Sequence, residues 1–282
     1  MAKYLFLDQA SARHPQVMSA LDDPNARVVI SDAYLAEFSR WVPDRISQHF
    51  QRLAQLRDRV YLAAAAGSCI QREIKSLTRT NQGHVIHSQG TVWIRQALAD
   101  PVALAQMNTE AELKKIVHED RYSDPATCSN YIGIVRIFET AMARANFRPV
   151  AHDAPITDDE LEGIIKLARL SVYRYVLGYG HSAVAAKKFA LGDSYLFREA
   201  SSRFCRAVDW AQAHGIQDQS KQQLYSENMD LEYVSLATYF DDFLVYEKRS
   251  RRNIENVRRL LKMSPSIRMM REATVTGIAG VA

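Results

Sequence analysis

The sequence predicts an α/β fold in which a parallel β-sheet is flanked by helices and carries a large, mostly helical insertion. Two observations lead to this fold class. Short apolar runs occur near both ends of the chain, and helical patterns separate them. Strands that alternate with helices pair in parallel and are covered by helices on both faces. The 282 residues are 47% hydrophobic and 24% charged, which fits one large or two small globular domains.

The first two strands are predicted at residues 3–8 and 26–30. The first is a short apolar run that ends in Asp8, and the turn signal Asp23-Pro24-Asn25 precedes the second. Ser31-Asp32 follows the second strand with the residue types of a helix N-cap. A helix is therefore expected from residue 33 to about residue 40.

Less regular patterns follow. Pro43 interrupts the helix that carries Glu37, and Asp44 can restart a helix that runs to about Arg57. Residues 59–66 are ambiguous, because β-branching near their start favours a strand whereas the alanines favour a helix. Residues 80–108 give no clear pattern.

Helices dominate the middle of the chain. Capping boxes begin at Thr109 and at Thr157, where side chain and backbone can satisfy each other's exposed groups. The helix after Thr157 has apolar residues at helical spacing and is expected to stop at Gly178. A second long helix is expected over residues 187–214.

The last part of the chain has a clearer pattern. Asn228 is expected to cap a short helix that contains Asp230. Asp241-Asp242 then precede a strand at residues 243–246, which leads to Glu247. A basic helix is expected from Lys248 onward, with apolar residues at helical spacing, namely Ile254, Val257, Leu260 and Leu261.

Charge and cysteine usage limit the class of protein. Lys248 to Arg271 contains nine Lys or Arg and one Glu, in a chain of net charge +4. Such a segment fits a nucleic-acid partner, and it fits a solvated helix face equally well. Three scattered cysteines argue against a disulfide framework or a thiolate zinc site. We expect a cytoplasmic protein, because there is no signal-peptide pattern and no apolar stretch near the roughly 18 residues of a membrane span.

Four acids carry the functional hypothesis. Asp8 and Glu247 follow apolar runs, and Glu37 and Asp230 are placed near the starts of helical segments. Carboxylates gathered at strand ends repel one another unless a cation lies between them, and oxygen ligands favour Mg²⁺ or Mn²⁺. Taken singly, each acid is explained as well by a helix cap or a surface ion pair.

The residues YLFLDQA, VVISDAYLAEF and ENMDLEYVSLATYFDDFLVYEKR resemble the PIN-like domain nucleases. The resemblance covers about a quarter of the chain, at its two ends. It implies a metal-dependent endonuclease with catalytic residues Asp8, Glu37, Asp230 and Glu247, of which the first three bind Mg²⁺ or Mn²⁺. It also implies RNA as the favoured substrate and a toxin or phage-defence role. Glu247 departs from the family, which more often has Asp, so Asp241 or Asp242 is an alternative fourth acid.

The resemblance sets the expected domain layout. Residues 1–262 form one PIN-like nuclease domain with a helical insertion at about 67–222, and residues 263–282 form a tail. Substrate contacts are expected from the basic residues that follow the last strand, Lys248, Arg249, Arg251 and Arg252. Two other functions stay open: an inactive PIN-like RNA-binding or assembly module, and a structure-specific DNA nuclease. The sequence leaves an inhibitor protein or a second copy of the chain undecided as partners.

A second group of residues could bind nucleic acid. Tyr173, Arg174 and Tyr175 could stack on bases and contact phosphates, together with Arg198, Arg203 and Arg206. Most of these residues are explained as well by the polar faces of helices.

Overall fold

The chain divides into two units, which are described separately here. The first unit comprises residues 1–69, 81–128 and 220–251, and the second comprises residues 70–80, 129–219 and 252–282. The computed structural model describes residues 2–8, 11–13, 19–38, 51, 53–100, 125–144, 155–213, 220–245 and 247–263. Within these, only the backbone is described at 13, 37–38, 125–128, 141–144, 213 and 221–222. The predicted insertion at 67–222 overlaps the second unit only in part, because residues 81–128 belong to the first.

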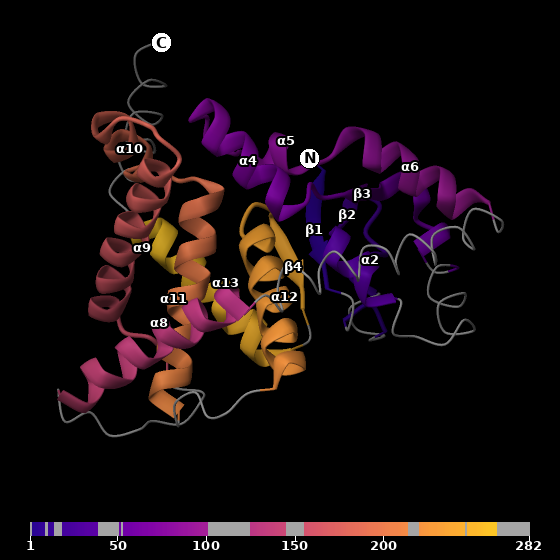
Figure 1. Ribbon diagram of the computed structural model, residues 1–282. Coiled ribbons are helices and arrows are strands. Elements are labelled where there is room, and N and C mark those ends of the chain that lie inside the picture. The colour runs from indigo at the N-terminus through magenta and orange to yellow at the C-terminus, as the bar shows by residue number, and fades with distance from the viewer. Residues whose placement is uncertain are drawn as a thin grey trace, which may run out of the picture. The chain divides into compact units, whose positions relative to one another are not determined.

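A four-stranded parallel sheet forms the centre of the first unit (Figure 1). The strands lie in the order β3-β2-β1-β4. Their bounds are Lys3–Leu7 (β1), Ala26–Ile30 (β2), Val60–Leu62 (β3) and Asp242–Leu244 (β4). The predicted α/β class and parallel pairing are therefore confirmed, and the first two strands lie where the apolar runs placed them.

The central strands are buried because apolar residues face both sides of the sheet. Leu5, Phe6 and Leu7 of β1 are all buried, as expected for a strand covered on both faces. The Phe6 ring is stacked on Phe240 with centroids 5.7 Å apart and meets Tyr233 edge-on at 5.9 Å. The helix that carries Tyr233 is thereby fixed against β1.

The predicted N-cap at Ser31 is confirmed. The Ser31 hydroxyl accepts a hydrogen bond from the Tyr34 backbone N–H at 3.1 Å, at the start of helix α2 (Asp32–Phe38). The expected end of this helix at about residue 40, and the helix restart at Asp44, lie outside the described residues.

The ambiguous segment 59–66 contains both a strand and the start of a helix. Val60–Leu62 forms edge strand β3, and helix α4 (Ala66–Ser76) begins four residues after the strand ends. Both backbone groups of Leu62 are hydrogen-bonded. Its N–H donates to the Thr91 hydroxyl, and its carbonyl accepts from the His87 backbone N–H. Thr91 lies on helix α6 (Ser88–Ala99), and His87 caps that helix after the short helix α5 (Gln82–Val85), so the outer edge of β3 is covered.

The last elements of the first unit differ from expectation in their bounds. Helix α12 runs over Lys221–Ala237 and is capped by Ser220 rather than by Asn228. Asn228 is instead buried within the helix, and its side-chain amide donates to the Leu224 carbonyl at 2.9 Å. Strand β4 ends at Leu244, short of the predicted residue 246.

Helix α13 (Lys248–Met263) follows β4, and its residues belong to both units. The predicted apolar positions are all buried, which confirms the helical spacing read from Ile254, Val257, Leu260 and Leu261. Residues 264–282, the predicted tail, lie outside the described residues.

The second unit is helical. Helix α9 (Asp158–Gly178) packs against both α10 (Ala183–Ala190) and α11 (Tyr195–Ala213) (Figure 1). Helix α8 (Pro125–Arg144) supplies further residues to this unit. The capping box at Thr157 and the stop at Gly178 are confirmed, whereas the capping box predicted at Thr109 lies outside the described residues.

The prediction of a single helix over residues 187–214 is wrong, because α10 ends at Ala190 and α11 begins at Tyr195. Ser194 caps α11, its hydroxyl accepting from the Phe197 N–H at 3.1 Å. Gly192 lies against the Arg79 guanidinium, and a Cβ at this position would stand 1.9 Å from Arg79 Cζ. The interruption was not predicted, because apolar residues recur at helical spacing on both sides of Gly192-Asp193-Ser194.

Candidate functional site at the carboxyl edge of the sheet

Asp8 is the first residue after β1, which lies between β2 and β4. Its backbone N–H donates to the Leu244 carbonyl at 3.2 Å, so it stands beside the end of β4. Its carboxylate Oδ2 accepts from the Ser11 hydroxyl at 2.9 Å and from the Ser11 N–H at 3.3 Å. The half-buried Asp8 side chain is thereby oriented, and it also caps the short helical turn Ser11–Arg13.

The strand order makes the end of β1 a special position. The chain proceeds from β1 to β2 and β3 on one side and later places β4 on the other side of β1. The order therefore reverses between β1 and β4. Open α/β sheets bind ligands outside the carboxyl ends of their strands at such a switch point. Asp8 is the acid that the described part of the chain places at this point.

Glu247 lies beyond the carboxyl end of β4 and begins α13. Its carbonyl accepts from the Arg251 N–H at 3.0 Å, and its carboxylate Oε2 accepts from the Ser250 hydroxyl at 3.1 Å. The side chain is exposed. Glu247 thus binds the first turn of α13 through Ser250 while it lies at the same edge of the sheet as Asp8.

The alternative fourth acids lie at the opposite edge. In the β1–β4 register Asp242 is paired with Leu5, three residues before Asp8, which is about 10 Å along a strand. Asp242 binds Lys3 at 3.0 Å, and the Asp241 carboxylate accepts from the Tyr4 N–H at 2.8 Å. Both acids hold the amino ends of β1 and β4 together, so neither stands in for Glu247.

The remaining predicted ligands lie on two helices that contact each other, α2 and α12. Glu37 is in α2, but its side chain is not among those described. Asp230 is partly buried and lies in the middle of α12, not near a helix start as the sequence suggested. Among the described side chains, no three His, Cys, Asp or Glu form a group able to hold a metal ion. The Glu37 carboxylate is not one of these described side chains.

The basic residues that follow β4 have different environments. Lys248 and Arg249 are exposed in the first turn of α13. Arg251 donates from Nη2 at 2.8 Å and from Nε at 3.2 Å to the Val245 carbonyl, which fixes the chain just after β4. Arg252 forms an ion pair with Asp209, a buried residue that also binds Arg206 at 2.8 Å. Arg252 therefore has a structural partner, and Lys248 and Arg249 are the stronger candidates for phosphate contacts.

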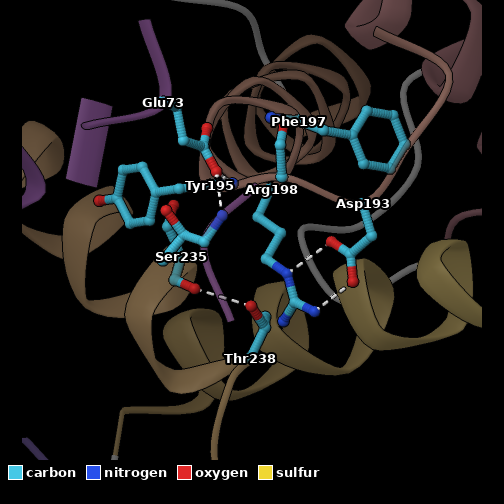
Figure 2. A network of polar contacts seen from close by, with 9 residues as sticks. Glu73, Asp193, Tyr195, Phe197, Arg198, Ser235 and Thr238 are labelled. Atoms are coloured by element: carbon cyan, nitrogen blue, oxygen red, sulfur yellow. Dashed lines mark hydrogen bonds and ion pairs between the residues drawn. The ribbon is translucent and has the colours of Figure 1, made fainter. Parts of the chain in front are cut away.

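Several buried carboxylates carry no prediction from the sequence, among them Glu232 and Glu73. Glu232 on α12 is buried, and its Oε1 accepts from the Ala66 N–H at 3.3 Å at the start of α4. Glu73 in the second unit is fully buried and accepts from three backbone N–H groups, those of Thr80, Tyr195 and Leu196, at 2.7–3.0 Å. Figure 2 shows Glu73 beside Tyr195. Burial raises the pKa of the Glu73 carboxyl above its usual value, while the three N–H donors act in the opposite direction.

A sequence signal for Glu73 existed in the pattern around it. Cys69, Glu73 and Ile74 fall on the apolar face of α4, so the acid interrupts a buried face. Buried acids are bound to donors in nearly every folded protein, and this one lies at the N-terminus of α11. Figure 2 also shows Arg198, whose Nε donates to Asp193 at 2.8 Å just before that helix begins.

The two cysteines with described side chains, Cys69 and Cys205, are both buried. Burial raises the pKa of the Cys205 thiol to about 12, which makes it a poor nucleophile. Among the described helices, none combines the length and the apolar character needed to cross a membrane.

Comparison with known proteins gives no match for this chain, whether with family models, curated proteins or solved structures.

Proposed function

We propose that this protein is a metal-dependent nuclease of the PIN-like type, with Asp8 as its central carboxylate. One observation carries the proposal: Asp8 stands at the carboxyl end of β1, at the point between β1 and β4 where the strand order reverses. An acid held at the ligand-binding edge of a parallel sheet is suited to bind a hard divalent cation. The resemblance of the surrounding residues to that family supports the same reading.

The positive charge beside this edge supports an anionic substrate. The N-terminus of α13 carries a partial positive charge, and cations in a first turn oppose it. The first turn nevertheless contains Lys248, Arg249 and Arg251, of which Lys248 and Arg249 are exposed. This arrangement costs helix stability and places exposed positive charge just after β4, which favours a phosphodiester backbone.

Each predicted residue has a role in the proposal. Asp8, Glu37 and Asp230 bind Mg²⁺ or Mn²⁺, and Glu247 completes the set of catalytic acids. Bound divalent cations activate a water molecule and neutralise charge on the phosphoryl group. Lys248 and Arg249 hold the phosphates on either side of the scissile bond. Asp8 is oriented for its role by the two hydrogen bonds from Ser11.

A second function is favoured by one specific observation. Glu247 is exposed, and its carboxylate accepts a hydrogen bond from the Ser250 hydroxyl in the first turn of α13, which is a structural role. A PIN-like module that has lost catalysis would bind RNA through the same basic residues without cleaving it. We favour the nuclease because Asp8 occupies the switch point. A toxin or phage-defence role in the cytoplasm is the biological setting that we propose with it.

The experiment is a cleavage assay with purified protein on labelled single-stranded RNA, structured RNA, single-stranded DNA and a DNA flap. We expect RNA cleavage with Mn²⁺ or Mg²⁺ that EDTA abolishes. Cleavage of the flap alone would assign the site to DNA. Metal-independent RNA binding without cleavage of any substrate would support the inactive module and contradict the nuclease.

A further inference from the structure

A cationic face with exposed tyrosines lies in the second unit, remote in sequence from the acids of the sheet. It is built from the C-terminal part of α4, the end of α9 and helix α10. Two contacts bring these segments together: His181 Nε2 lies 2.6 Å from the Ile74 carbonyl, and Arg79 Nη2 donates to the Lys188 carbonyl at 2.9 Å. We call it the α4–α10 face. Its exposed members are Arg72, Lys75, Arg174, Tyr175, Tyr179, Lys187 and Lys188.

The charge of these segments has one sign. Residues 163–192 contain five Lys or Arg and no acid. Residues 70–80 contain three Lys or Arg and a single acid, Glu73, which is fully buried and bonded to backbone N–H groups. The acids of α9 lie within its first turns, and Tyr175 is 13 residues beyond the last of them, about 20 Å along the helix. The exposed charge of the face is therefore positive.

Two tyrosines interleave with this charge. Tyr175 and Tyr179 are one helical turn apart, with ring centroids 5.0 Å apart and hydroxyl oxygens 3.3 Å apart. Their exposed fractions are 40% and 60%, so both rings present surface to solvent. Neither belongs to the buried face of α9, which is formed by Leu161, Ile164, Ile165, Ala168, Val172 and Val176. The packing of that buried face therefore leaves both rings partly exposed.

Stabilisation of helix ends is another explanation for the cations of this face, but it does not explain the tyrosines. Lys75 lies in the last turn of α4, and Lys187 and Lys188 lie in the last turn of α10, where cations stabilise helix ends. That effect gives no reason for adjacent exposed tyrosine rings. Cations that follow a phosphate chain, next to aromatic rings on which bases stack, are the combination by which proteins bind single-stranded nucleic acid.

We infer that the α4–α10 face binds single-stranded RNA, with phosphates at Lys75, Lys187 and Lys188 and a base stacked on Tyr179. The inference rests on the proposed function in taking the bound strand as the nuclease substrate. It adds a contact outside the acidic site and names the substrate as unpaired. Arg79 is excluded from ligand contact, because its guanidinium is bound to the end of α10.

The test is fluorescence anisotropy with a 5′-labelled oligouridine in EDTA, so that binding is measured without cleavage. Tyr179→Ala should weaken binding at least about fivefold, whereas Tyr179→Phe, which keeps the ring, should bind like wild type. Lys187→Ala with Lys188→Ala should lower the slope of log K against log salt by about 1.4, at about 0.7 for each phosphate lost. The matched control, Arg57→Ala with Arg136→Ala, removes two exposed cations elsewhere and should leave the slope unchanged.

Circular dichroism spectra show that the variants are folded before binding is compared. Equal binding by wild type, Tyr179→Ala and the double lysine variant would overturn the inference. Binding to phosphatidylserine vesicles but not to RNA would overturn it as well. The outcome is separable from the proposed function, because loss of cleavage with intact binding contradicts the nuclease alone, and cleavage that is independent of this face contradicts this inference alone.

Discussion

Glu73 Oε1 accepts a hydrogen bond from the Tyr195 N–H at 2.7 Å, at the first residue of α11. Six residues after Glu73, Arg79 donates to the Lys188 carbonyl at the end of α10. A carboxylate thus meets the positive end of one helix and a guanidinium meets the negative end of the preceding one. One short segment, residues 73–80, holds both sides of the break between α10 and α11.

Replacing Glu73 by alanine should destabilise the protein strongly. The substitution leaves three buried N–H groups without their acceptor, and each such group costs about 1–3 kcal/mol. We expect a loss of at least about 3 kcal/mol in the free energy of unfolding, measured by urea denaturation. Glu73→Gln keeps an acceptor oxygen and should cost less. A cost for Glu73→Ala below about 1 kcal/mol would contradict this role.

The same carboxyl should make stability depend on pH. Because its folded pKa is raised, the folded state binds a proton more tightly than the unfolded state does. Its contribution is fully present below the unfolded value of 4.5 and is lost as the pH rises through the folded pKa. The unfolding free energy of wild type relative to Glu73→Gln should therefore fall as the pH is raised from 4.5. A difference that grows with pH would show that the N–H donors outweigh burial.

The stability costs of substituting Gly192 and Arg79 should not be additive. A Cβ at Gly192 would lie 1.9 Å from Arg79 Cζ, so Gly192→Ala displaces the guanidinium and breaks its bond to the Lys188 carbonyl. Each of Gly192→Ala and Arg79→Ala should cost about 1–3 kcal/mol, as expected for a hydrogen bond from a charged donor. The double variant should cost about as much as Arg79→Ala alone. Additive costs in the double-mutant cycle would show that the two residues act independently.

The basic residues at the start of α13 should have different roles, some in RNA binding and one in stability. Lys248→Ala with Arg249→Ala removes two exposed cations and should reduce the salt dependence of RNA binding by about 1.4 in log–log slope. Arg252→Ala should instead lower stability, because Asp209 loses one of its two cationic partners. The measurements are RNA binding at several salt concentrations and urea denaturation. A larger binding loss for Arg252→Ala than for the double variant would reverse the assignment.

The parts of the fold that follow from local patterns were predictable. Strands at 3–8 and 26–30, the Ser31 cap, the Thr157 box and the buried stripe of α13 each depend on a few adjacent residues. The bounds of α12 were missed because Asn228 has the residue type of a cap but is buried and bonded to its own helix at Leu224. The interruption of the helix at Gly192 is packed against the Arg79 guanidinium, which is more than 100 residues away in the sequence. No local pattern contains such a contact.

The candidate site was predictable to the same extent. The position of Asp8 followed from a strand that ends in an acid, but its importance depends on the strand order, which the sequence does not display. Asp241 and Asp242 looked equivalent to Glu247 until the register placed them at the other edge. The sequence named Tyr175 as a residue that could stack on a base, but it did not indicate Tyr179, which follows α9. The exposure of both rings distinguishes them from the core face of that helix.

The most direct test of the central claim is the rate of Mn²⁺-dependent RNA cleavage by Asp8→Asn. The substitution keeps the size and the hydrogen bonds with Ser11 in reach but removes the negative charge that a hard cation requires. The matched control is Asp58→Asn, which makes the same chemical change at an exposed acid remote from the switch point. The account predicts a loss of at least about 100-fold for Asp8→Asn and an unchanged rate for Asp58→Asn. Full activity of folded Asp8→Asn would contradict it.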